Sequence, residues 1–267
     1  VIVIETFRNA WRVPELRKKL LFTFFIIIIY RVGGTVPVPY LDSVALSAWF
    51  EQSASSGDFF SYLNVLSGGN FSKATLLALS VSPYINAQII IQLLTYALPP
   101  LERLQKEGPE GRKKLNKITK YASLAIAIFQ AWAYYLTMKK AGAVVYKDGF
   151  DKIFAEIVII ACFTAGASLT IWLGDEINEK GIGNGISMLL FAGIIARGPS
   201  AVIGLFDYMK TGEAKNIILV IAILVVFILM IGFIIFMNEA ERRIPIQYAK
   251  RVVGRKQYGG QNTFIPI

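Results

Sequence analysis

The sequence predicts an all-α polytopic membrane protein with six transmembrane helices. Of its 267 residues, 55% are hydrophobic and 17% are charged, whereas an average soluble domain carries about 25% charge. The mean hydropathy is +0.53, and apolar runs recur at the length of about 20 residues that a membrane span needs. The predicted spans are 20–38, 74–98, 121–138, 153–173, 186–206 and 216–237.

Composition excludes several classes of function. The chain has no histidine and a single cysteine, Cys162, so a disulfide framework and the common zinc sites are ruled out. The absence of histidine also removes the usual general base and the serine triad. No GxxxxGK[ST] loop is present, which argues against an ATP site. We therefore predict a protein that is not an enzyme and has no cofactor, metal or catalytic residue.

The chain begins with an amphipathic segment, residues 1–19, which we expect on the cytoplasmic side. The first span follows and contains the run LLFTFFIIIIY. It is not a cleavable signal peptide, because the apolar run is too long and no small-residue cleavage site follows it.

The segment 41–70 after the first span is unusual for a loop. It contains SASSGDFFSYLNVLSGGN, in which FFSYLNVL is too apolar for a solvated loop and SGG is a flexible break. Backbone that enters the membrane without spanning it must be buried in protein or line a cavity. We predict a short re-entrant helix at about 58–71, with a solvated loop as the alternative.

The second span is the most polar of the six. Its Ser82-Pro83 step removes a backbone hydrogen bond and favours a kink. Asn86, Gln88 and Gln92 are costly against lipid. They could bond to neighbouring helices, which contributes about 0.6 kcal/mol on average, or they could face a water-filled path. The sequence slightly favours the path.

The fifth span follows the sequence GIGNGIS at 181–187. A nucleotide site at such a glycine pattern needs a preceding strand, whereas a membrane helix precedes it here. A tight cytoplasmic turn between antiparallel spans is the better interpretation, because glycine allows positive φ. The span itself is interrupted at Arg197, Gly198 and Pro199.

The basic residues are distributed unevenly among the loops. Nineteen lie on one side, in the N-terminus, the loops after spans two and four and the tail, and eight lie on the other side. Because basic loops stay in the cytoplasm, both ends of the chain are predicted to be cytoplasmic. An even number of spans agrees with this orientation.

The tail, residues 238–267, has a pattern of its own. Apolar residues alternate at Ile244, Ile246 and Tyr248 before a break at Gly254, which predicts a hairpin with a basic tip. A docking element for RNA phosphate or acidic protein surfaces would have such a tip. The alternative is attraction to anionic lipid, about 1 kcal/mol per basic residue near the surface.

Five long blocks carry a resemblance that runs the whole length of the chain. In order they are FRNAWRVPELRKKLLFT, LSVSPYINAQIIIQLLT, KEGPEGRKKLNKITKY, LGDEINEKGIGNGISMLLFAGI and ERRIPIQYAKRVVGRK. With these blocks the chain resembles the SecY family, the central subunits of bacterial protein-conducting channels. The resemblance implies a ten-helix clamshell channel, of which this chain would hold six helices and a truncated loop after span six.

The resemblance implies a passive aqueous channel of hourglass shape that passes unfolded secretory polypeptides and releases membrane segments sideways into lipid. By position, the family's apolar pore ring corresponds to Val81, Ile85, Ile186 and Leu190. The members of each pair are four residues apart and would share a helix face. An apolar ring seals by dewetting and grips no particular substrate. Plain helix packing is the alternative.

The resemblance also implies three further sets of residues. The plug set is Asp58, Phe59, Phe60, Tyr62, Leu63, Val65, Leu66, Gly68, Gly69 and Phe71. The lateral-gate set is Pro83, Asn86, Gln88, Gln92 and Gln130. The set for ribosome or motor docking is Arg242, Arg243, Lys250, Arg251, Arg255 and Lys256.

The implied partners are the small membrane subunits SecE and SecG, the motor ATPase SecA, the ribosome, signal peptides with nascent chains, and membrane lipids, but no specific DNA. The implied location is the bacterial plasma (inner) membrane.

Two other classes compete with the channel. Half of a secondary transporter would place a substrate site at broken helices, with Arg197 as the clue. Against it, we count no acidic residue inside a span that could relay a proton. A membrane enzyme is disfavoured because histidine, a metal cluster and an intramembrane acid pair are lacking. Saturable uptake of a small solute would favour the transporter, whereas signal-peptide crosslinks to span two would favour the channel.

Overall fold

The computed structural model describes residues 11–53, 64–146, 149–210, 214–241, 243–246, 251–253, 256–258 and 263–266. The chain divides into two compact units, Val1–Pro199 and Ser200–Ile267. The helices of the first unit are α2 (Pro14–Gly33), α3 (Ser43–Ser53), α5 (Ser82–Ala97), α6 (Pro99–Lys106), α7 (Pro109–Lys140), α8 (Phe150–Lys180) and α9 (Gly185–Ile195). The second unit contains most of α10 (Gly198–Lys210), then α11 (Ala214–Glu239) and the strands β1 (Arg243–Ile246), β2 (Arg251–Val253), β3 (Lys256–Tyr258) and β4 (Thr263–Pro266).

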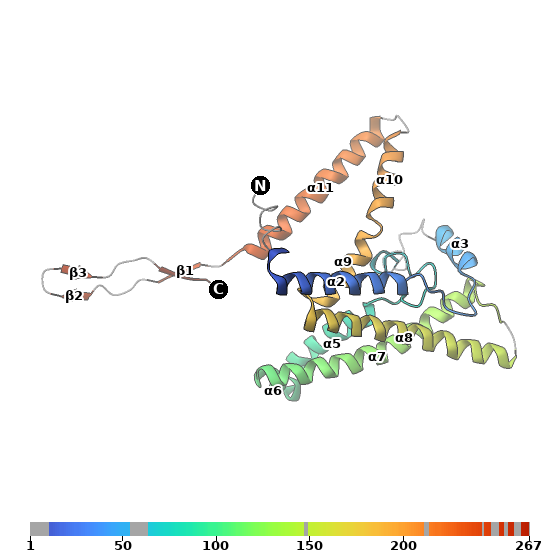
Figure 1. Cartoon of the computed structure of the whole chain (residues 1–267), viewed down its shortest axis with the longest axis horizontal. Coiled ribbons are helices and arrows are strands. Elements are labelled where there is room, and N and C mark those ends of the chain that lie inside the picture. The colour runs from blue at the N-terminus through green and yellow to red at the C-terminus, as the bar shows by residue number, and fades with distance from the viewer. Residues whose placement is uncertain are drawn as a thin grey trace. The chain divides into compact units, whose positions relative to one another are not determined.

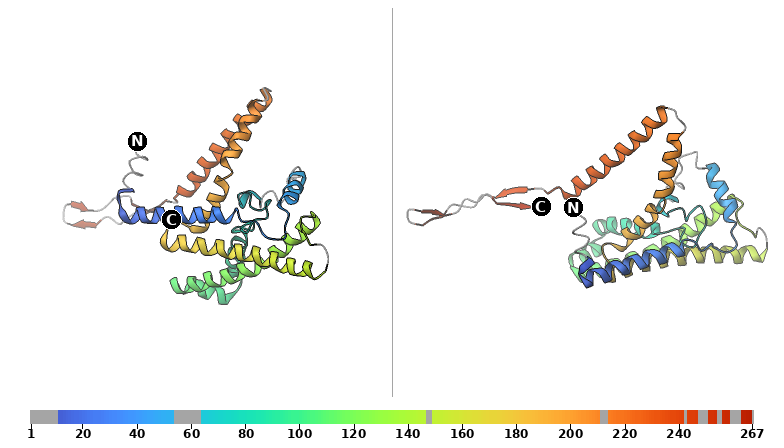
Figure 2. Two further views of the ribbon diagram at one scale, coloured as in Figure 1. Left: turned by 45° about the vertical axis from the view of Figure 1, so that its right-hand side comes forward. Right: turned by 45° about the horizontal axis from the view of Figure 1, so that its top comes forward.

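The first unit is built on α7 and α8, the two longest helices of the described residues. They follow each other in the chain and pack against each other. Helix α2 packs on α8, so that α2, α8 and α7 run side by side (Figure 1). Helix α5 packs on α7, and the short α9 packs on α8 and α2. The same arrangement is visible in both views of Figure 2.

The larger of two apolar clusters fills the end of this unit near the loop between α7 and α8. Its centre is aromatic, because the ring of Tyr134 stacks on Phe71 at 4.1 Å and lies 5.0 Å from the ring of Phe163. The buried Tyr134 hydroxyl donates a hydrogen bond to the carbonyl oxygen of Phe71. This bond satisfies two polar groups that would otherwise be costly inside an apolar cluster.

The second apolar cluster joins α2, α8 and α9. It contains Ile26 and Tyr30 of α2, Leu173 and Ile177 of α8, and Leu189 of α9. Each of these side chains is at most 4% exposed. The cluster therefore holds three helices together by burial of apolar surface.

An irregular segment, residues 71–81, lies between the two clusters. Phe71, Ala74, Ala78 and Leu79 contribute to the larger cluster, whereas Leu77 and Val81 contribute to the second. Part of its backbone pairs with the extended stretch after α2: the amide of Leu76 donates to the carbonyl of Val36 at 2.8 Å, and Val38 donates to Ala74 at 3.2 Å. Such partners allow non-helical backbone to be buried.

The segment approaches α8 closely at a glycine. A Cβ atom built on Gly166 would lie 1.8 Å from the carbonyl oxygen of Leu76. Only glycine lets the helix and the crossing backbone come this near. Gly166 therefore fixes the depth at which the irregular segment lies on α8.

Two predictions for the second span are wrong. The helix does not begin at residue 74, because the backbone of 71–81 forms turns, with Ala74 at φ 48° and Ser80 at φ 49°. Pro83 does not kink the helix either, because it stands in the first turn of α5. A proline there loses no intrahelical bond, since the first amides of a helix have no partner.

Three stretches of the described residues are long and apolar enough to cross a membrane: Phe150–Lys180, Gly185–Lys210 and Lys215–Glu239. The first three predicted spans are not among them. Helix α5 has only 16 residues, and charged or polar residues flank or interrupt the apolar parts of α2 and α7. The expected break in the fifth span is confirmed, because α9 ends at Ile195 and α10 begins at Gly198. The count of no acidic residue inside a span is wrong, because Glu156 lies in α8 within the predicted range 153–173.

In the second unit the tail strands form two antiparallel pairs. Strand β1 pairs with β4, and β2 pairs with β3. The pairing agrees with the hairpin that the alternating pattern predicts. Helix α11 is apolar around its circumference, as expected of a helix that faces lipid.

The replacement Gly166→Ala in the complete protein should lower its midpoint temperature of thermal unfolding in detergent. The added methyl group clashes with the backbone of Leu76, and overpacking of this kind typically costs about 1–3 kcal/mol. Gly232→Ala in α11 is the matched control, because a Cβ there meets no atom within 4 Å. An equal or higher midpoint for Gly166→Ala than for the control would contradict this packing.

Candidate functional site

The four side chains of the predicted ring meet in the second apolar cluster. Val81 is 0% exposed and Ile186 is 9% exposed, and both belong to the cluster. Ile85 and Leu190 are half-buried and pack against it. Two elements that are about 100 residues apart in the chain therefore bring these four side chains to one apolar cluster.

Val81 and Ile85 are positioned by the start of α5. Val81 is the residue before the helix, and its carbonyl accepts a hydrogen bond from the amide of Ile85 at 3.1 Å. The two side chains thus share a helix face, as their spacing predicts. With one turn per 3.6 residues, the same face continues along α5 to Gln88 and Gln92, which are both exposed. On this face of α5, the apolar side chains of Val81 and Ile85 are therefore followed by the side-chain amides of Gln88 and Gln92.

Ile186 and Leu190 are positioned by the turn before α9. The Asn184 side chain accepts from the amide of Ser187 at 3.2 Å and so caps the helix. The amide of Gly185 donates to the Asn178 side chain at 2.8 Å. A Cβ on Gly185 would lie 1.9 Å from the carbonyl oxygen of Gly174 in α8. Glycine is therefore needed for this close contact, which fixes the position of the next residue, Ile186, along α8.

The glycine-rich turn is also tied to α2. Thr23 accepts a hydrogen bond from the amide of Ile182 at 3.1 Å through its hydroxyl oxygen. Gly183 has φ 75°, the left-handed conformation expected of a tight turn. The prediction of a turn between two helices is confirmed at this position.

The lateral-gate residues do not lie on one surface. Pro83 of α5 is buried, and Gln130 of α7 is half-buried. Asn86 is exposed on a face that it shares with apolar side chains of α5. These exposed apolar neighbours are Ile89, Ile90 and Leu93. Gln88 and Gln92 instead continue the face of Val81 and Ile85.

The plug prediction falls only partly on the described residues. Asp58, Phe59, Phe60, Tyr62 and Leu63 lie outside them. Residues 64–66 form one helical turn, with Val65 exposed and Leu66 half-buried, and turns follow from 67 onward. The helix does not reach residue 71 as predicted, because Gly68 and Gly69 take φ values of 69° and 91° and end it.

The end of this segment is held against α9 and the larger cluster. A Cβ on Gly68 would lie 2.6 Å from the carbonyl oxygen of Gly193 in α9. The amide of Phe71 donates to the Ser67 hydroxyl at 3.0 Å, and Phe71 itself is buried among the aromatic side chains. The C-terminal part of the predicted plug, residues 67–71, is thus packed against the rest of the first unit, and the irregular segment 71–81 follows it directly.

The docking residues are only partly described. Arg242, Lys250 and Arg255 lie outside the described residues. Arg243 is in β1, Arg251 in β2 and Lys256 in β3. Val253 and Lys256 are the last pair of their ladder. Lys256 therefore begins strand β3 and does not lie in the turn itself.

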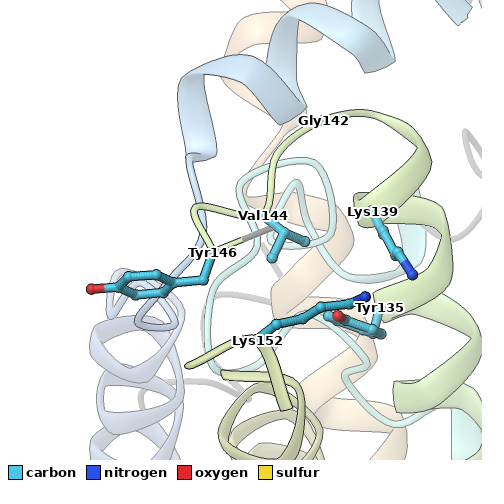
Figure 3. A pocket seen from close by; sticks show the side chains of 6 residues that line it. All are labelled: Tyr135, Lys139, Gly142, Val144, Tyr146 and Lys152. Carbon is cyan, nitrogen blue, oxygen red and sulfur yellow. The ribbon is translucent and has the colours of Figure 1, made fainter. Parts of the chain in front are cut away.

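Sequence reasoning missed three features that depend on tertiary structure. The Tyr30 hydroxyl and the Ser80 hydroxyl lie 3.0 Å apart and join α2 to the irregular segment. On the predicted cytoplasmic side, Lys120 pairs with Asp175 at 2.7 Å and links α7 to α8. A cavity at the other end of α7 is lined by side chains shown in Figure 3. No local sequence signal marks these features, since the first two join elements 50 and 55 residues apart and the cavity depends on how the end of α7, the loop and the start of α8 fold together.

One charged pair carries a shifted pKa. The Glu176 carboxylate accepts a hydrogen bond from Lys180 at 2.7 Å, and this bond and its charge raise the pKa of Lys180. The pair is one helical turn apart at the exposed end of α8. Since Lys180 is already protonated at neutral pH, the shift has no consequence for charge there.

Comparison with known proteins gives a consistent assignment. The chain is 40% identical over 275 residues to the protein translocase subunit SecY of Streptomyces coelicolor, with 99% of this chain and 62% of the relative covered. It is 40% identical to the protein translocase subunit SecY of Aquifex aeolicus, with 98% and 61% covered. The chain thus spans about three fifths of the length of these relatives.

Solved structures agree on the fold. A structure described as a protein-conducting channel matches with a TM-score of 0.58 at 20% identity, covering 94% of this chain and 52% of that one. A structure concerning the plug domain of the SecY protein matches with a TM-score of 0.58 at 22% identity, covering 91% and 52%. The family model named SecY matches residues 75–267. This chain, a membrane protein with helical spans, belongs to the SecY family.

Proposed function

We propose that the complete protein is the pore-forming subunit of a protein translocation channel, and that this chain contributes six of its spans and part of its constriction. The observation that carries the proposal is the meeting of Val81, Ile85, Ile186 and Leu190 in one apolar cluster. Two of the four are half-buried and so remain available to a further surface. Family membership and the fold of solved channels support it.

The physical basis is the behaviour of water in a narrow apolar passage. A constriction lined by aliphatic side chains excludes water and ions when it is empty. It also forms no directed hydrogen bonds, so it does not select among the side chains of a passing polypeptide. No covalent chemistry is required of the protein, which agrees with a chain that lacks histidine.

The amide stripe of α5 fits the same function. Gln88 and Gln92 follow the constriction on one helix face and would line the aqueous path above it, because exposed amides are costly against lipid. Asn86 lies on a different face with apolar neighbours. We assign that face to the lateral gate through which apolar segments would pass into lipid, and residues 58–71 to the plug.

The predicted orientation places both ends of the chain in the cytoplasm. The excess of basic residues on one side supports it. The antiparallel tail, β1 to β4, then projects into the cytoplasm as a docking element for the ribosome or the motor SecA. The subunits SecE and SecG complete the proposed assembly in the bacterial plasma membrane.

Replacing Ile85 and Leu190 together with serine in the complete protein should raise resting ion conductance across a planar bilayer. Each serine adds a hydroxyl that stabilises water in the constriction, so the closed channel would leak. The control is Ile28→Ser with Ile194→Ser, which changes two exposed apolar residues of α2 and α9 that have no assigned role, at 44% and 46% exposure.

The two double variants separate the function from general damage. Leak from the first and none from the second supports the channel. Equal resting conductance in all three proteins would mean that the cluster is only helix packing. Saturable uptake of a small solute by the complete protein in liposomes would instead support a transporter.

Reversing the charge at the hairpin end, Arg255→Glu with Lys256→Glu, should weaken ribosome or motor binding about tenfold at low salt, which equals about 1.4 kcal/mol for two exposed charges. Membrane insertion should be unchanged, because charges close to the spans set topology. The loss should shrink with added salt, since exposed charges are screened over about 8 Å at physiological ionic strength. Arg255→Lys with Lys256→Arg is the control, and normal binding of both partners by the reversed variant would refute docking.

A further inference from the structure

A small cavity lies where α7 ends and α8 begins. Its volume is about 310 Å³. Tyr135 and Lys139 reach it from the last two turns of α7, and Lys152 reaches it from the first turn of α8. The connecting loop supplies the remaining walls, which are Gly142, Val144 and Tyr146. The cavity is on the side opposite to the basic cytoplasmic loops and has no part in the proposed constriction.

The described residues that line this cavity carry two positive charges and no negative charge. Lys139 and Lys152 line the cavity together with Tyr135, and Figure 3 labels the three side chains. Neither lysine forms an ion pair with any residue in the described part of the chain. The nearby carboxylate of Glu156 interacts with the Tyr135 hydroxyl and does not line the cavity. Two like charges that line one cavity are stabilised by an anion bound between them.

The surroundings of the cavity are those of a membrane surface. The ring of Tyr40 lies edge-on to Tyr146 at 5.6 Å and to Phe154 at 6.3 Å. Tyrosine is enriched at the level of lipid headgroups, and lysine extends its charge to that level from an apolar stem. The first turns of α8 carry exposed apolar side chains, namely Phe150, Ile153, Phe154 and Ile157.

We propose that this cavity binds the phosphate of an anionic phospholipid headgroup. Lys139 and Lys152 contact the phosphate oxygens, and the acyl chains lie along the exposed apolar side chains at the start of α8. A free phosphate ion offers the same oxygens but gains nothing from the apolar surface. The combination of two cations with an apolar stripe therefore favours the lipid. The proposal concerns a site apart from the channel function and does not depend on it.

Native mass spectrometry of the complete protein, released from detergent with defined lipids, tests the site. Phosphatidylglycerol should bind more tightly than phosphatidylcholine, and Lys139→Gln with Lys152→Gln should weaken phosphatidylglycerol binding about thirtyfold, since each lysine near a surface contributes on the order of 1 kcal/mol. The matched control, Lys73→Gln with Lys140→Gln, removes two exposed lysines that do not line the cavity. It should bind as the unaltered protein does.

A footprint on the unaltered protein covers the case in which the double variant fails to fold. Acylation of lysine amines, read by peptide mass spectrometry, should be slowed at Lys139 and Lys152 by phosphatidylglycerol but not by phosphatidylcholine. Lys140 should react equally in all samples. Millimolar inorganic phosphate alone should leave both cavity lysines reactive.

Four results would overturn the proposal. Equal protection by inorganic phosphate would identify a free-anion site. Equal binding of both lipids, or equal loss in both double variants, would mean that general charge attraction acts at this surface. Protection that persists without lipid and disappears only when small subunits are removed would identify a contact with a protein partner.

Discussion

The burial of residues 71–81 between two apolar clusters is the constraint on which the rest of the first unit depends. This segment is not helical, yet Leu77 and Val81 are 0% exposed. Its buried backbone is possible because it pairs with Val36 and Val38 and because Gly166 lets it lie directly on α8. The position at which it ends sets where α5 begins.

The proposed constriction follows from that placement. Val81 is the last residue of the segment, and Ile85 follows it within the first turn of α5. From the other side, the contact of Gly185 with Gly174 fixes the start of α9 and so the height of Ile186. Close glycine contacts on α8 therefore position both halves of the apolar cluster. Both parts of the apolar cluster are therefore positioned by one packed helix, α8, and not by a flexible loop.

Much of this could be predicted from the sequence, and the failures have physical causes. The pairs Val81 with Ile85 and Ile186 with Leu190 were predicted from spacing and resemblance, and they do meet in one cluster. The start of α5 was misplaced because residues 74–81 are as apolar as a helix. Their turns depend on tertiary contacts, such as the Tyr30–Ser80 hydrogen bond, that no local pattern reports. The cavity at Lys139 and Lys152 is not predicted, because the sequence pattern indicates only on which side of the membrane these lysines lie.

The central claim is that the cluster of α5 and α9 faces the path of a translocating polypeptide. Photocrosslinking of a stalled secretory chain in the complete protein tests it most directly, with a photoreactive residue placed in turn at Ile85, Leu190, Ile28 and Ile194. The account predicts adducts from Ile85 and Leu190 and few from the two exposed positions. Adducts of equal yield at all four positions, or none at Ile85 and Leu190, would contradict it.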